Sequence, residues 1–158
     1  MSPAVQTPAF AQWLVGARGA AQQPPAQPRI PLVVAGHEVG SVAAGVLDDI
    51  GLQRLLDKRE QLSFQERNGA FAWHLPVPDA EVTPALNALA AALRQVGRCG
   101  PWRDEQLAVT NAQGAVVGTV ERGAVRVLGI ATRAVHLVGL APDGRMWVQR
   151  RSLTKPNH

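Results

Sequence analysis

The sequence predicts an α+β fold: an antiparallel sheet with two or three helices. Three observations favour this class. The chain has 158 residues, 46% hydrophobic and 18% charged, which suits one globular core. Short apolar runs separated by glycine-containing turns indicate paired strands. One segment has apolar residues at helical spacing, which indicates an amphipathic helix.

The first 29 residues are expected to be a flexible lead-in. Phe10, Trp13 and Leu14 are spaced for one apolar turn of helix. Residues 22–28 contain three prolines and are typical of a stiffened linker.

The core of the fold is expected to begin at residue 30. Residues 31–35 and 38–42 are predicted strands, with Gly36 in the turn between them. A helix is predicted over residues 44–58, although Gly51 weakens its pattern.

A strand, a turn and a second strand are predicted over residues 64–75, with Asn68-Gly69 at the turn. The clearest helix follows. Thr83 is expected to be its N-cap, Pro84 its first residue and Gly97 its end. Its apolar stripe consists of Leu86, Leu89, Ala90 and Leu93.

The remaining elements are two hairpins separated by a short helix. Residues 107–110 and 115–120 are expected to pair across residues 111–114, and the short helix is expected within residues 121–129. Residues 134–141 and 146–149 are then predicted to form the last hairpin.

A weak internal repeat links the two halves of the chain. Residues 33–42 and 109–120 each show a strand, a turn and Val-Gly-Ser/Thr-Val, followed by a predicted helix. The repeat suggests two similar strand-turn-strand-helix units. Chance similarity in a chain rich in Ala, Val and Gly is the alternative.

Charge is distributed unevenly along the chain. Residues 1–121 carry nine basic and eleven acidic side chains, whereas residues 122–158 carry seven basic and one acidic. The C-terminal segment is therefore expected to face anions or an acidic partner. The few aromatic residues (4%) disfavour binding of single-stranded nucleic acid by base stacking.

Several classes of site are disfavoured by the residues present. Cys99 is the one cysteine, so a disulfide framework and a cysteine zinc site are excluded. The four histidines lack metal-ligand spacing, and neither a Gly-rich phosphate loop nor a Gly-x-Ser-x-Gly motif occurs. With no long apolar run and no secretion signal, we expect a cytoplasmic protein without a membrane span.

Two segments carry candidate binding residues. In the first, Trp102, Arg103 and Glu105 could stack on a flat ring and hydrogen-bond its edge. The alternative is a loop whose Trp packs on the core while its charges are solvated. In the second, Arg151 and Lys155 are suitable donors to phosphate, and a polar edge strand is the alternative.

The order and spacing of five segments resemble the N-terminal domain of Nudix hydrolases of the thiamine-pyrophosphokinase-associated type. They are residues 39–42 (Val-Gly-Ser-Val), 64–69 (Phe-Gln-Glu-Arg-Asn-Gly), 102–105 (Trp-Arg-Asp-Glu), 120–130 and 134–139. The most specific stretch runs from Glu121-Arg122-Gly123-Ala124 through Val135-His136-Leu137 to Arg150-Arg151-Ser152-Leu153-Thr154-Lys155. The resemblance covers most of the chain but not residues 1–29.

The resemblance implies three parts: the lead-in 1–29, an accessory α+β domain over 30–130, and the first hairpin of an incomplete Nudix domain over 131–158. The parent enzyme would hydrolyse a nucleotide-like or thiamine-diphosphate-like diphosphate with magnesium or manganese. Trp102, Arg103 and Glu105 would contact the organic part of the substrate, and Arg151 and Lys155 its phosphates.

The sequence departs from the family at the catalytic motif. The Nudix box needs clustered glutamates to bind divalent metals, and here no Glu follows Glu121. No catalytic or metal-binding residue is therefore assigned, and we expect a fragment of a longer hydrolase that is inactive without the missing Nudix domain.

Two other functions remain open. The chain could be a stand-alone, non-catalytic domain that binds a small molecule or a protein. Binding of nucleic acid through the basic C-terminal segment is ranked last. A homodimer formed through an unpaired sheet edge is also compatible with the sequence.

Overall fold

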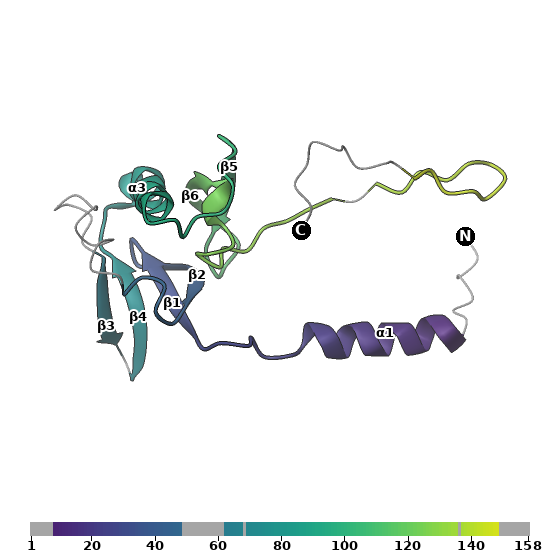
Figure 1. Ribbon diagram of the computed structural model, residues 1–158, viewed down its shortest axis with the longest axis horizontal. Helices are drawn as coiled ribbons and strands as arrows, with labels where there is room; N and C mark the ends of the chain where they lie inside the picture. Colours follow the sequence, from purple (N-terminus) through teal and green to yellow (C-terminus); the bar gives the residue numbers. More distant parts are fainter. Residues whose placement is uncertain (1–7, 49–61, 68, 136, 149–158) are drawn as a thin grey trace.

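The fold is α+β, as the sequence predicts. The computed structural model describes residues 8–48, 62–67, 69–135 and 137–148 (Figure 1). In these ranges lie two α-helices, two short 3-10 helices and six strands. Their bounds are α1 (Pro8–Ala21), β1 (Arg29–Val34), β2 (His37–Ala43), β3 (Ser63–Arg67), β4 (Ala70–Leu75), η1 (Asp79–Glu81), α3 (Val82–Gln95), β5 (Gln106–Thr110), β6 (Val116–Glu121) and η2 (Arg122–Ala124).

The strands form a four-stranded sheet of order β2-β1-β4-β3 and a two-stranded sheet of β5 and β6. The hairpins β1–β2, β3–β4 and β5–β6 are antiparallel, as predicted. However, β1 and β4 pair in parallel, so the larger sheet is mixed and not purely antiparallel. Each hairpin is specified by its own turn, whereas the junction between hairpins depends on the shared core. Leu32 lies beside Trp73 and Val34 beside Leu75, and all four side chains are buried.

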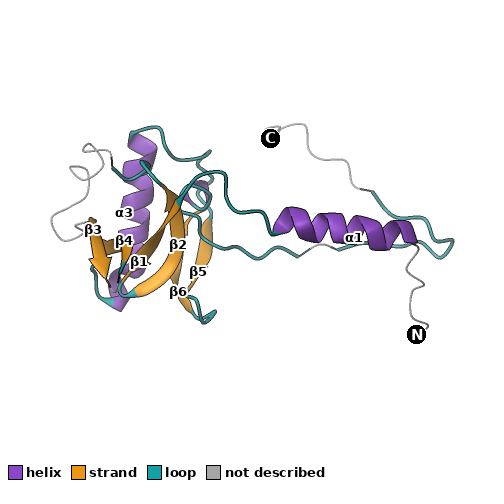
Figure 2. Cartoon of the chain, turned by 90° about the horizontal axis from the view of Figure 1, so that it is seen from below, coloured by secondary structure: helices purple, strands orange, loops and turns teal. Residues whose placement is uncertain are grey.

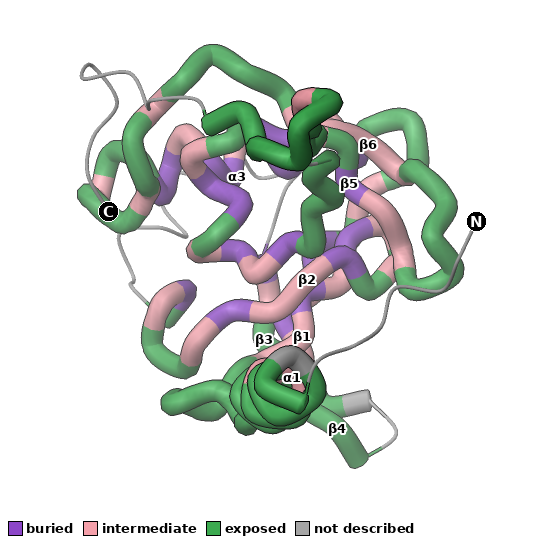
Figure 3. Tube along the Cα trace, turned by 90° about the vertical axis from the view of Figure 1, so that its right-hand side faces the viewer, coloured by how far each residue is buried: buried purple, intermediate pink, exposed green. Residues whose placement is uncertain are grey.

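The hydrophobic core lies between the larger sheet, α3 and the β5–β6 hairpin (Figures 2 and 3). The predicted helix stripe is confirmed, because Leu86, Leu89, Ala90 and Leu93 are fully buried. Since core residues extend from Leu32 to Ile130 and come from both sheets, the described residues between 29 and 130 share a single core.

The C-terminal end of α3 agrees with the prediction, whereas its N-terminal end does not. Gly97 adopts φ +71° and closes the C-terminus, where the Arg98 N–H reaches the Leu93 carbonyl at 2.8 Å. Thr83 is not the N-cap, because the helix begins at Val82. Instead, Thr83 Oγ1 accepts a hydrogen bond from the Thr119 N–H at 3.0 Å. A tertiary contact to β6 thus replaces the expected local cap.

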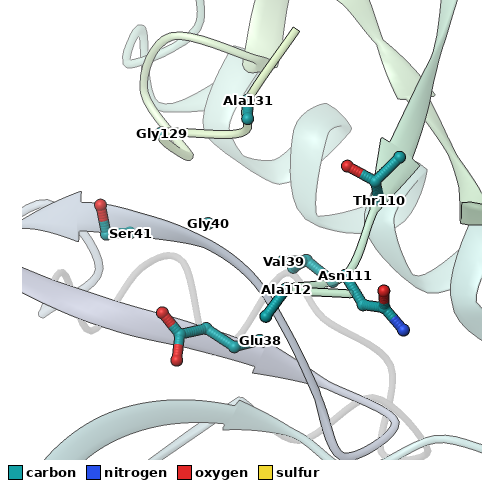
Figure 4. Close-up of a pocket in the computed structure, with 9 residues that line it drawn as sticks. All are labelled: Glu38, Val39, Gly40, Ser41, Thr110, Asn111, Ala112, Gly129 and Ala131. Atoms are coloured by element: carbon teal, nitrogen blue, oxygen red, sulfur yellow. The ribbon is translucent and has the colours of Figure 1, made fainter. Parts of the chain in front are cut away.

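Strand β2 and the chain after η2 approach each other at two glycines. The Ser41 N–H donates to the Leu128 carbonyl at 3.0 Å, and Arg29 donates to the Ser41 carbonyl. A Cβ on Gly40 would lie 2.5 Å from the Leu128 carbonyl oxygen, and one on Gly129 would collide with the Ser41 carbonyl. Glycine at both positions therefore permits the contact that closes the fold (Figure 4).

Other predicted elements are shorter or longer than expected. The apolar turn near Trp13 is part of a 14-residue helix, α1, which projects away from the core (Figure 1). A helix is predicted over residues 44–58, but residues 44–48 are not helical and form turns and bends. Residues 49–58 lie outside the described residues. The helix expected within residues 121–129 is the 3-10 helix η2 followed by turns.

The last predicted hairpin is only partly formed. Leu140 and Met146 make a single antiparallel bridge, without strands on either side among the residues described up to 148. Most of its apolar side chains are exposed, including Leu137 (98%) and Trp147 (77%). Without burial on a neighbouring surface, a two-stranded hairpin gains little stability. Over the described part of the chain, no helix has the length and apolar character required to cross a membrane.

The close approach at Gly40 gives a stability prediction. Gly40→Ala should lower the free energy of unfolding by about 2 kcal/mol or more, because the new methyl group would overlap backbone that cannot rotate away. Urea denaturation would measure this change. Gly16→Ala in α1 is the matched control, since nothing lies near its Cβ. Equal stabilities of the two variants would contradict the proposed contact.

Candidate functional site

The 102–105 loop (Trp-Arg-Asp-Glu) lies between α3 and β5 and has an unusual backbone. Asp104 adopts φ +54°, a left-handed conformation that Asp tolerates better than most residues. Its carboxylate accepts a hydrogen bond from Trp102 Nε1 at 2.7 Å. The conformation turns the chain so that the N–H groups on both sides of Asp104 reach the same acceptor.

That acceptor is the Glu121 carboxylate, at the end of β6. Its Oε1 accepts from the Arg103 N–H at 2.8 Å and from the Gly123 N–H at 3.1 Å, and its Oε2 accepts from the Glu105 N–H at 3.1 Å. Glu121 is only 1% exposed and is the one buried charged residue among those described. A buried carboxylate is tolerated when several donors meet it, so Glu121 fastens the loop to η2.

A second polar contact fixes β6 against α3. Asn87 Oδ1 accepts from the Glu121 N–H at 3.0 Å, while Asn87 Nδ2 lies 3.2 Å from the Thr119 carbonyl. Asn87 also exchanges hydrogen bonds with the Gln106 side chain on β5. One amide on the helix therefore sets the position of both strands that lead to the loop.

The Trp102 ring contacts other residues of the protein on the Arg94 side and on the core side. The Arg94 guanidinium lies 4.5 Å from the centre of its ring, and the half-buried ring packs against the core. The arrangement leaves Trp102 outside the groove described next, although it belongs to the same loop.

An open groove of about 1610 Å³ runs between this loop, β5 and residues 122–134. Arg103 and Glu105 line it. Four further arginines do so as well, namely Arg98, Arg122, Arg126 and Arg133, and Glu105 is the one acidic residue in the lining. Arg122 Nη1 lies 2.7 Å from Glu105 Oε2, so this pair is neutralised within the groove. The remaining charge is strongly positive, which favours an anionic ligand.

The structure brings together some of the sequence-predicted residues. Arg103 and Glu105 share the groove, Trp102 lies outside its lining, and Arg151 and Lys155 fall outside the described residues. Asn87 and Glu121 are not predicted as organising residues, and Arg98, Arg122, Arg126 and Arg133 are not predicted as groove residues. The only signal for Glu121 was its place inside a motif of the resemblance.

Cys99 also lines the groove, in a half-buried position. Burial raises the pKa of its thiol, and the nearby Glu121 carboxylate raises it further, while Arg94 and a hydrogen bond from Gly100 act in the opposite direction. The thiol is therefore protonated at neutral pH, which disfavours it as a nucleophile.

A smaller hollow lies at the β2–Gly129 crossing (Figure 4). Its wall combines backbone of β2 with the end of β5 at Thr110 and Asn111, and Glu38 is its charged residue. It marks where the two sheets meet. Over the described ranges, no three Asp, Glu, His or Cys side chains are grouped closely enough to hold a metal ion.

Comparison with known proteins adds no assignment: no protein-family model matches the chain, and no curated protein matches it.

Removing the Glu121 carboxylate tests its role. Glu121→Ala should cost about 3 kcal/mol of unfolding free energy, because three backbone N–H groups lose their acceptor. Glu121→Gln should cost less, since one acceptor oxygen remains. Denaturant titration would measure both, with exposed Glu38→Ala as the control. A Glu121→Ala variant as stable as Glu38→Ala would rule out the proposed contact.

The raised pKa of Cys99 predicts a pH dependence. Iodoacetamide should alkylate the folded protein more slowly than a model thiol at pH 8, and the midpoint of the rate profile should lie above the ordinary pKa of 9.0. In that range the unfolded chain loses the proton first, so stability should fall as pH rises above this value and be unaffected below it. Arg94→Gln should raise the pKa further, because Arg94 lowers it in the native protein. A rate profile centred below pH 9 would refute this.

Proposed function

We propose that residues 30–130 are the substrate-recognition domain of a Nudix-family hydrolase that cleaves a nucleotide-like or thiamine-diphosphate-like diphosphate. The observation that carries the proposal is that segments of the resemblance meet in space. The 102–105 loop is joined to residues 121–123 through the Glu121 carboxylate. Gly40 and Ser41, from another segment, contact Leu128 and Gly129.

The groove supplies the chemistry that such a domain needs. Guanidinium groups bind phosphate oxygens through directed hydrogen bonds, and five arginines line the groove. Its lining extends to residues 131–134, where the resemblance places the crossing into the Nudix domain. Substrate held there would lie close to the start of the catalytic domain.

The segment beyond this crossing is consistent with a missing neighbour. Val135, Leu137, Trp147 and Val148 are all exposed. Apolar side chains gathered on one segment are typical of a surface that another part of a protein covers. In the proposed enzyme, the rest of the Nudix domain would cover them.

The residues present do not fit the catalytic metals of this enzyme class. The sequence lacks the clustered glutamates, and the described part of the chain lacks a group of metal ligands. In the proposed enzyme, the Nudix domain would hold magnesium or manganese. This chain's own contribution is to bind and orient an anionic substrate.

A stand-alone binding domain is the alternative. It is favoured by the single hydrophobic core that the described residues between 29 and 130 share. Such a domain would use the same groove without catalysis.

The mass of the natural protein separates the two functions. For the hydrolase, we expect the protein purified from its own cells to exceed 16.8 kDa and to hydrolyse thiamine diphosphate or ADP only with magnesium or manganese. Mass spectrometry and a phosphate-release assay would test this. A mass of 16.8 kDa without metal-dependent hydrolysis would overturn the hydrolase assignment and favour the stand-alone domain.

A further inference from the structure

The groove beside the 102–105 loop has a large local excess of positive charge. Five arginines and one glutamate line it, whereas residues 1–121 as a whole carry more acidic than basic side chains. Glu105 is already paired with Arg122. Among the described groove residues, Arg98, Arg103, Arg126 and Arg133 form no ion pair. Their charges are therefore left for a ligand.

The backbone that presents two of the groove arginines, Arg103 and Arg122, is held in place. The Arg103 N–H donates a hydrogen bond to the Glu121 carboxylate. Arg122 lies between Glu121 and Gly123, and the Gly123 N–H donates to the same carboxylate. The Arg122 N–H itself donates to the Glu105 carbonyl at 2.8 Å. Guanidinium groups projecting from an ordered backbone lose less freedom on binding than groups on a mobile loop.

We infer that this groove binds the phosphate groups of a diphosphate compound, with Arg98, Arg103 and Arg126 as the donors. The inference rests on the proposed function for its choice of ligand, and it moves Arg103 from the organic part of the substrate to the phosphates. A diphosphate carries several negative charges and presents oxygens to more than one guanidinium. A single carboxylate carries one negative charge and would match fewer of these arginines.

The groove lining favours a small diphosphate over a polynucleotide. Single-stranded nucleic acids are bound by basic grooves with aromatic rings on which bases stack. No aromatic side chain lines this groove in the described part of the chain, and the nearby Trp102 ring is covered by Arg94.

Substitution of the arginine side chains should leave the fold intact. Arg98, Arg103 and Arg126 are exposed, and Arg103 contacts Glu121 through its backbone N–H and not through its side chain. The same holds for Glu105, whose N–H also binds Glu121. Loss of binding in these variants would then report on the ligand contacts.

The test is calorimetric titration of the 158-residue chain with inorganic pyrophosphate at low salt. Arg103→Ala and Arg126→Ala should each weaken binding about five- to tenfold, because each removes charged hydrogen bonds at an exposed site. Glu105→Gln should strengthen binding, since it removes the one negative charge and frees Arg122. Arg18→Ala in α1 is the control and should bind like the parent.

Three results would overturn the inference: no binding of pyrophosphate, equal binding by Arg126→Ala and Arg18→Ala, or tighter arginine-dependent binding of a single-stranded oligonucleotide. Weaker binding by Glu105→Gln would count against it as well. Failure of the hydrolase assignment is distinguishable, because it appears in the mass and the metal-dependent activity, neither of which enters this titration.

Discussion

The Glu121 carboxylate is the interaction on which the candidate site depends. Removing a carboxylate from water is costly unless donors replace the lost hydration. Here three backbone N–H groups from the loop and from η2 supply that replacement. Because those donors come from segments distant in sequence, solvating this one charge also brings the segments together. Glu121 thereby fixes the 102–105 loop, whose Arg103 and Glu105 line the groove.

Glu121 can act in this way because other contacts set its own position. The buried stripe of α3 holds the helix against the sheet, and Asn87 on the same helix binds the Glu121 N–H. The Thr83 hydroxyl on the same helix accepts a hydrogen bond from the Thr119 N–H, two residues before Glu121 in β6. Apolar burial thus sets the position of the helix, two polar side chains set the position of β6, and β6 carries the carboxylate to the loop. The packing of the helix restricts the position of β6, and the position of β6 restricts that of the Glu121 carboxylate.

The sequence predicts best the features that depend on neighbouring residues, although the N-cap at Thr83 and the start of the 44–58 helix are wrong, and it misses those that depend on distant residues. The three hairpins and the stripe of α3 follow from turn residues and spacing, and the structure confirms them. Parallel pairing of β1 with β4 depends on how two hairpins share a core, which no local pattern shows. The same limit applies to the site. Arg103 and Glu105 are predicted as binding residues because they lie in a short segment rich in charged residues. The role of Glu121 depends on hydrogen bonds from a loop distant in sequence, which the sequence does not show.

The groove is open, and residues 30–130 supply most of its lining. Its lining ends at residues 131–134, and the following segment carries exposed apolar side chains that the described residues do not cover. A wall added there would exclude water and strengthen the attraction between arginines and phosphate, because the local dielectric would fall. Binding by residues 30–130 alone should therefore be weak and sensitive to salt. In the proposed enzyme, closure by the catalytic domain would couple tight binding of the diphosphate to its placement for hydrolysis.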